Sequence, residues 1–94
     1  MNISEIMDRI LALCAAYSAK EVYLFGSRAK GTATERSDFD IAVTGVTDVE
    51  GLRDAFDRLP TLYQIDVVDL DTCKNTFLLE DIKQYGRKIY PTFS

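Results

Sequence analysis

The sequence contains no histidine, only two cysteines and no long hydrophobic run, and each of these features excludes a class of function. Without imidazole groups there is no histidine metal ligand, no Ser-His-Asp triad and no histidine general base. Cys14 and Cys73 are too few for a disulfide framework, which indicates a reducing compartment. The longest uncharged apolar run, 11–17, is far too short to span a bilayer, and the first residues do not resemble a signal peptide. We therefore expect a soluble, cytoplasmic protein whose chemistry depends on carboxylates and cations.

Length and charge narrow the choice further. The 94 residues, 47% of them hydrophobic, suit one small globular domain that spans 1–94. Fifteen acidic residues against eleven basic ones give a net charge of −4. This charge argues against direct nucleic-acid binding, because such surfaces neutralise phosphates with Lys and Arg. A nucleotide that carries its own Mg²⁺ remains a suitable ligand.

Hydrophobic periodicity and capping signals predict alternating helices and strands. We expect helices at 2–19, 47–59 and 74–85, strands at 21–25, 38–43 and 64–70, and a short edge segment at 89–90. Capping boxes beginning at Asn2 and Thr47 open the first two helices. The connection 26–37 has room for about one helical turn, so the strands on either side of it should be antiparallel neighbours. The predicted fold class is α/β, with a small mixed sheet of three to four strands and helices packed on it.

The most informative pattern is Gly26-Ser27 followed, ten residues later, by Asp38-Phe39-Asp40. Gly26 ends an apolar strand and allows a sharp turn close to a ligand, while Ser27 can cap a helical turn whose N–H groups face an anion. Asp38 and Asp40, at i and i+2 on a strand, project from the same face about 6 to 7 Å apart. Such carboxylates suit Mg²⁺, which shares oxygen ligands with substrate phosphates. The pattern predicts a phosphate-binding turn that faces two metal-binding acids.

The strand expected at 64–70 offers two further carboxylates, Asp66 and Asp69. They are three positions apart and point to opposite faces, so only one of them can join the metal ligands. Asp66 lies within an apolar run, where an unpaired carboxylate would be costly unless a cation or hydrogen bonds receive it. On the residues alone both candidates, and a site of only two acids, stay open.

The runs LFGSRAKG at 24–31 and SDFDIAV at 37–43 resemble the signature of the minimal nucleotidyltransferases of the DNA polymerase beta superfamily. The resemblance is specific over 22–43 and continues more loosely to the closing helix. It implies a polymerase-beta-like nucleotidyltransferase fold in which Asp38, Asp40 and Asp66 bind two Mg²⁺ ions. Asp66 would also accept the proton of the attacking hydroxyl.

Three cations near the turn could reach the phosphates of ATP: Arg28, Lys30 and Arg36. The resemblance favours Arg28, together with Gly26 and Ser27, as the nucleotide-binding group. Lys30 and Arg36 are expected to be surface residues.

The chain offers no obvious wall for the nucleobase. Tyr17, Tyr23 and Tyr63 could stack on a base, but each falls where a core pattern already requires an aromatic side chain, and no second pocket is expected. A partner protein or a second copy in a homodimer would have to supply that wall.

The implied function is Mg²⁺-dependent transfer of a nucleoside monophosphate, AMP from ATP, to a hydroxyl acceptor with release of pyrophosphate. Proteins similar to this chain are paired with an all-helical HEPN-domain protein in toxin–antitoxin modules, where the family implies an antitoxin that adenylylates a tyrosine of its toxin. The alternative is a non-catalytic antitoxin that neutralises its partner by masking it. A transferase directed at aminoglycosides or nucleic acids is disfavoured, because the chain is short and acidic.

Overall fold

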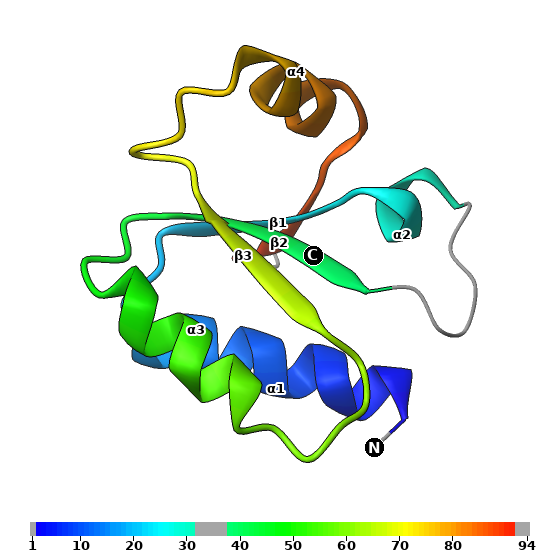
Figure 1. Ribbon diagram of the computed structural model, residues 1–94, viewed down its shortest axis with the longest axis vertical. Coiled ribbons are helices and arrows are strands. Elements are labelled where there is room, and N and C mark those ends of the chain that lie inside the picture. Colours follow the sequence, from blue (N-terminus) through cyan, green and yellow to red (C-terminus); the bar gives the residue numbers. More distant parts are fainter. Residues whose placement is uncertain (1, 32–37, 92–94) are drawn as a thin grey trace.

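The computed structural model describes residues 2–31 and 38–91, in which helices and strands alternate (Figure 1). In chain order these are α1 (Ile3–Ala16), β1 (Glu21–Phe25), α2 (Ser27–Lys30), β2 (Phe39–Thr44), α3 (Val49–Asp57), β3 (Ile65–Asp69), α4 (Thr76–Tyr85) and β4 (Arg87–Tyr90). The strands form one sheet in the order β3-β2-β1-β4. β2 and β3 are parallel, and the other neighbouring pairs are antiparallel. The predicted mixed α/β sheet is confirmed, including the antiparallel pairing of the first two strands.

Five of the six ends of the three predicted helices differ from the expectation by one to three residues, and two of these differences have a clear local cause. α1 begins after Asn2, whose side chain accepts a hydrogen bond from the amide three residues later, as predicted. It ends at Ala16 and not at 19, because the chain leaves the helical conformation and adopts a φ of 65° at Ser18. The cap of α3 is Asp48, whose carboxylate accepts the amide of the residue three positions on at 2.9 Å. The capping box predicted to begin at Thr47 is therefore wrong: the helix cap is the next residue, Asp48. A carboxylate caps a helix as well as a hydroxyl does.

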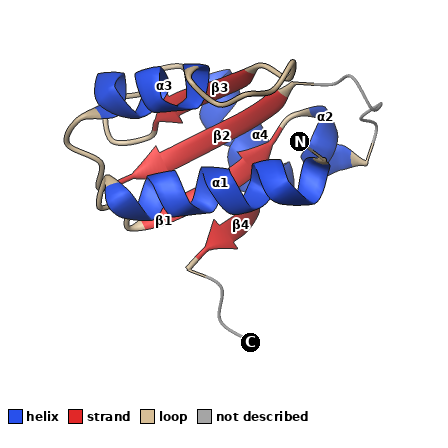
Figure 2. Ribbon diagram, turned by 90° about the horizontal axis from the view of Figure 1, so that it is seen from below, coloured by secondary structure: helices blue, strands red, loops and turns tan. Residues whose placement is uncertain are grey.

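Helices α1 and α3 cover one face of the sheet, which we call the covered face (Figures 1 and 2). The main core lies between these helices and the sheet, and it includes the fully buried side chains of Ile6, Ile10, Ile41 and Leu52. Alternate residues of β2 therefore point into a large apolar cluster, which gives this face the greater part of the hydrophobic stabilisation.

Helix α4 packs on the opposite face, which we call the α4 face (Figure 1). The buried cluster there is small and consists of Phe25, Ala42 and Ile82. Among the described residues, no helix is long and apolar enough to cross a membrane. One face of the sheet thus carries the main core, and the other carries only the small cluster beneath α4.

Candidate active site

Two of the predicted carboxylates are direct neighbours in the sheet. Asp40 of β2 pairs with Asp66 of β3 in the parallel register, and neighbouring strands lie about 4.8 Å apart. Side chains paired in this way point to the same face. That face is the α4 face, because Phe39 and Ile41 on either side of Asp40 are buried in the main core. Asp38 lies one residue before β2 and is exposed, as is Asp66.

The turn after β1 brings Gly26 against these acids. Its backbone has φ 74° and ψ −153°, a conformation that residues with a side chain rarely adopt. A Cβ atom on Gly26 would overlap the Oδ2 atom of Asp40, so the turn and the carboxylate are in close contact. Gly26, and not Ser27, is the cap of α2, which corrects the expected capping role of Ser27. Ser27 is instead the first residue of that helical turn.

Asp38, Asp40 and Asp66 are close enough for their charges to influence one another. Partial burial raises the pKa of Asp40, and the negative charges of Asp66 and Asp38 raise it further. Within residues 2–31 and 38–91, no three acidic or thiol side chains form a ready-made metal cage. Mg²⁺ is usually bound by one or two carboxylates together with phosphate oxygens and water. The Asp40–Asp66 pair next to the turn therefore suits a magnesium–nucleotide complex better than a free ion.

Asp66 and Asp69 are three positions apart on β3 and lie on opposite faces of the sheet, as the sequence predicted. Asp66 is exposed, so the expected cost of burying its carboxylate does not arise. Asp69 organises the turn that follows β3: its carboxylate accepts the backbone amide of Asp71 at 3.0 Å and the hydroxyl of Thr72 at 3.2 Å. The structure therefore gives Asp69 a structural role and leaves Asp66 beside Asp40.

The three predicted cations have different surroundings. The Arg28 guanidinium lies over the ring of Phe39, with its Cζ atom 4.1 Å from the ring centroid. Lys30 forms an ion pair of 2.8 Å with Asp81 of α4 and lies 5.0 Å from the ring centroid of Tyr85. Lys30 therefore connects α2 to α4 in addition to being at the surface, while Arg36 is outside the described residues.

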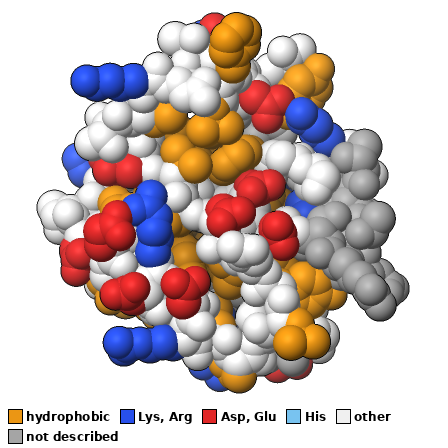
Figure 3. Space-filling view, viewed as in Figure 1, with side chains coloured by type: hydrophobic (Ala, Val, Ile, Leu, Met, Phe, Trp, Pro, Cys, Tyr) orange, Lys and Arg blue, Asp and Glu red, His pale blue; other side chains and the backbone are white. Residues whose placement is uncertain are grey.

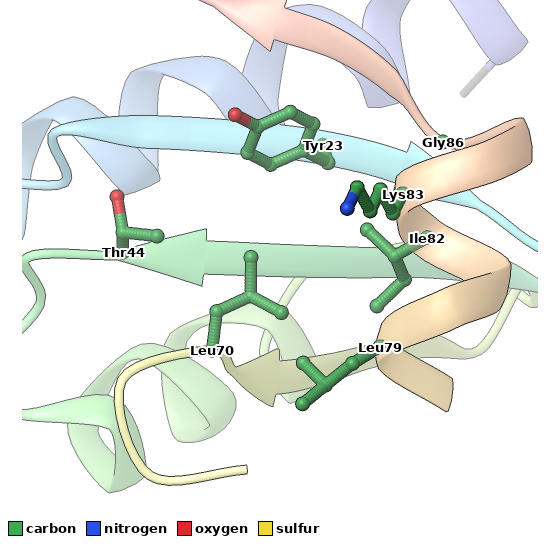
Figure 4. A pocket seen from close by; sticks show the side chains of 7 residues that line it. All are labelled: Tyr23, Thr44, Leu70, Leu79, Ile82, Lys83 and Gly86. Atoms are coloured by element: carbon green, nitrogen blue, oxygen red, sulfur yellow. The ribbon is translucent and has the colours of Figure 1, made fainter. Parts of the chain in front are cut away.

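A hollow of about 390 Å³ lies between the sheet and α4, which corrects the expectation that no second pocket exists (Figure 4). Its lining consists of Tyr23, Thr44, Leu70, Leu79, Ile82, Lys83 and Gly86. Thr44 follows Asp40 by four residues along β2, so this end of the hollow lies about 13 Å from Asp40 on the same face. Tyr23, another lining residue, pairs with Ala42, only two residues from Asp40, so the hollow also extends closer to the acids. In Figure 3, acidic side chains gather beside an apolar patch below α4.

Sequence reasoning missed the hollow because its lining residues come from separate elements and share the apolar pattern of a core. Tyr17 and Tyr63 pack against the main core, as predicted. Tyr23 packs against the small cluster and also lines the hollow.

Known proteins resemble this chain both in sequence and in structure. The family described as "Polymerase beta, Nucleotidyltransferase" matches residues 8–92. Among solved structures, a toxin–antitoxin complex with AMP-PNP contains a chain with 28% identity and a TM-score of 0.66, over 90% of this chain and 73% of that chain.

Two mutants of the toxin–antitoxin complex MntA–HpeT are also similar. One has 26% identity and a TM-score of 0.65, over 90% of this chain and 73% of that chain. The other has 28% identity and a TM-score of 0.64, over 92% of this chain and 72% of that chain. No curated protein matches the sequence. The family match covers most of the chain, including the turn and all three acids, and the protein therefore belongs to the polymerase beta nucleotidyltransferase family.

Proposed function

We propose that this chain is a Mg²⁺-dependent nucleotidyltransferase that moves AMP from ATP to a hydroxyl acceptor and releases pyrophosphate. The observation that carries the proposal is the position of Asp40, which is paired with Asp66 and lies against the Gly26 turn. A turn that permits close approach of a ligand and two adjacent carboxylates are the elements that this reaction needs at one place. We also propose that residues 1–94 act as a single domain.

Each acid has a separate role in this proposal. Asp38 and Asp40 would hold two Mg²⁺ ions together with the triphosphate, and Asp66 would share one of these ions. When bound, Mg²⁺ supplies charge neutralisation and lowers the pKa of the acceptor hydroxyl. Asp66 is exposed and would accept the hydroxyl proton. The hydroxyl oxygen then bonds to the α-phosphorus, and the bond from that phosphorus to the bridging oxygen of pyrophosphate breaks.

The comparisons support a protein acceptor. The similar solved structures are toxin–antitoxin complexes, and one of them contains AMP-PNP. We propose that the acceptor is a tyrosine of an all-helical HEPN-type toxin and that this chain is the antitoxin. Such a partner, or a second copy of this chain, would complete the site around the nucleotide.

Transfer of label from ATP tests the proposal. The purified protein is incubated with the product of the neighbouring reading frame and with ATP labelled at either the α- or the γ-phosphate. Label should appear on the partner from α-labelled ATP only, and only with Mg²⁺. The double variant Asp38→Asn/Asp40→Asn should lose at least about 1000-fold of this activity, because both metal ions would lose carboxylate ligands.

A matched control removes the same number of negative charges at a site far from the proposed metal ligands. Asp54→Asn/Asp57→Asn alters two exposed residues of α3, at the opposite side of the sheet, and should leave transfer unchanged. Label from γ-labelled ATP, or full transfer by the Asp38/Asp40 double variant, would contradict the proposed enzyme. If that variant transfers nothing but still neutralises the partner, the masking alternative explains the neutralisation.

A further inference from the structure

We propose that Arg28 is a positioning residue, which fixes the Gly26 turn relative to the metal-binding acids by stacking on Phe39 and Tyr63. The inference rests on the proposed function and concerns the same site. It assigns Arg28 a role different from the nucleotide contact that the family resemblance implies.

Three side chains form this stack. The Cζ atom of Arg28 lies 4.1 Å from the ring centroid of Phe39 and 5.4 Å from that of Tyr63. The two rings meet edge to face, with centroids 5.6 Å apart and an interplanar angle of 83°. Both distances from the guanidinium fall within the range of about 6 Å over which a cation is attracted to a ring face. The rings thus bind the guanidinium from two directions.

The position of Phe39 explains why the stack matters for the site. Phe39 lies between Asp38 and Asp40 in sequence, is 1% exposed, and points into the covered face. Its neighbour Asp40 points to the α4 face, because successive residues of a strand alternate. The buried ring of Phe39 therefore anchors the chain segment that carries both acids.

Arg28 links that segment to the turn. It is the second residue of α2, directly after Ser27, and its guanidinium is held by the first residue of β2. The stack therefore joins the element that would hold the triphosphate to the element that would hold the metal ions. Because a displacement of about 1 Å can cost about 100-fold in rate, a tie between these two elements has a direct kinetic consequence.

A phosphate ligand and a positioning residue respond differently to substitution. If Arg28 bound phosphate, Arg28→Lys would keep the positive charge, and its effect would appear in the KM for the nucleotide. Substitution of Tyr63 would then have no effect on transfer. A lysine lacks the planar group that stacks on aromatic rings, so a positioning role predicts a loss in Arg28→Lys and the same loss when Tyr63 is removed. Tyr63 precedes β3, packs against the main core and is not one of the proposed metal ligands.

The experiment compares Tyr63→Leu, Tyr63→Phe, Arg28→Lys and the double variant Tyr63→Leu/Arg28→Lys. Backbone amide shifts of Gly26 and Asp40 are measured by NMR in the free protein, and kcat and KM for ATP are measured in the transfer assay. Tyr63→Leu and Arg28→Lys should each shift both amides and lower kcat by about 10-fold to 100-fold, with KM changed less than about twofold. Tyr63→Phe keeps the ring and should match the unmodified protein.

The double variant should lose no more than the stronger single variant, because the two side chains act as one unit. The proposal is overturned if Arg28→Lys raises KM while kcat is kept, or if Tyr63→Leu leaves both the amide shifts and kcat unchanged. If the unmodified protein transfers no label, the proposed function fails, and the amide shifts alone decide. Shifts in Tyr63→Leu that are absent from Tyr63→Phe then support positioning, and equal spectra contradict it.

Discussion

The two faces of the sheet differ in what their side chains do. Among residues 2–31 and 38–91, the core cluster on the covered face has fourteen buried residues, whereas the cluster on the α4 face has three. The α4 face instead presents Asp40 and Asp66, the Gly26 turn and the hollow beneath α4. β2 contributes to both faces, since Phe39 and Ile41 point one way and Asp40 points the other. One strand thus joins the part that stabilises the fold to the part that we propose performs the chemistry.

This difference means that stability and activity should respond separately to substitution. Changes on the covered face remove apolar burial, so they lower the free energy of unfolding and leave the acids in place. Changes at the acids remove charges that repel one another and groups that would bind metal, but no apolar burial. They should therefore affect ligand binding more than folding.

Truncating the core on each face gives the largest expected effect on stability. Leu52→Ala, in the large cluster of the covered face, should lower the free energy of unfolding by about 3 to 5 kcal/mol, because the surrounding helices cannot close the cavity. Ile82→Ala should cost closer to about 2 kcal/mol, since it adjoins a hollow and belongs to a small cluster. Urea unfolding measures both values. An equal or larger cost for Ile82→Ala would contradict the assignment of the main core to the covered face.

Two glycines with similar φ allow a second comparison of intermediate size. Gly26 has φ 74° and its Cβ position is occupied by the Asp40 carboxylate, whereas Gly31 has φ 76° and no described atom within 4 Å of its Cβ position. Gly31→Ala should cost about 1 kcal/mol from backbone strain alone. Gly26→Ala should cost about 2 to 3 kcal/mol and also abolish transfer, because Asp40 must move.

Thermal unfolding and the label-transfer assay, applied to both glycine variants, check this prediction. Equal stability losses, or a Gly26→Ala protein with full activity, would show that the turn and Asp40 are not in contact.

The smallest expected change is a gain in stability. Partial burial and the charges of Asp66 and Asp38 raise the pKa of Asp40 in the folded protein. Between the unfolded pKa of about 3.9 and the higher folded value, the native state binds more protons, so stability falls as pH rises through that window. Asp40→Asn removes this loss. It should have a slightly higher Tm than the unmodified protein at pH 7, since solvent screens much of the repulsion at this partly exposed carboxylate.

The gain should disappear at pH 3, where the carboxyl group of Asp40 is protonated in both states. Asp54→Asn, on an exposed part of α3, serves as the control and should change stability by less than about 0.5 kcal/mol at either pH. A loss of stability in Asp40→Asn at pH 7 would mean that its carboxylate is stabilised by partners and not opposed by burial and like charges.

Local signals made much of the fold and site predictable. The apolar run before Gly26 and the short connection after it were enough to predict β1 and its antiparallel pairing with β2. The i, i+2 spacing of Asp38 and Asp40 predicted a strand that begins at Asp38, whereas β2 begins at Phe39 and only Asp40 of the two lies in it. These features depend on neighbours in sequence, which is why periodicity and spacing can identify them.

Features that depend on distant residues were not predictable from patterns. The pairing of Asp40 with Asp66 requires the parallel register of β2 and β3, which no local signal determines. The stack on Arg28 requires Tyr63, which follows it by more than thirty positions and looks like an ordinary core residue in the sequence. The hollow likewise needs β1 and α4 to be packed before its lining can be recognised.

Paramagnetic Mn²⁺ with AMP-PNP tests most directly whether the α4 face binds a metal–nucleotide complex. Mn²⁺ replaces Mg²⁺ at oxygen ligands and broadens the NMR signals of nearby nuclei. We expect the amide signals of Gly26, Asp40 and Asp66 to broaden, and that of Leu52 on the covered face to remain sharp. Asp40→Asn/Asp66→Asn should prevent the broadening. Unchanged spectra, or broadening centred on residues away from these acids, would contradict a catalytic site on this face.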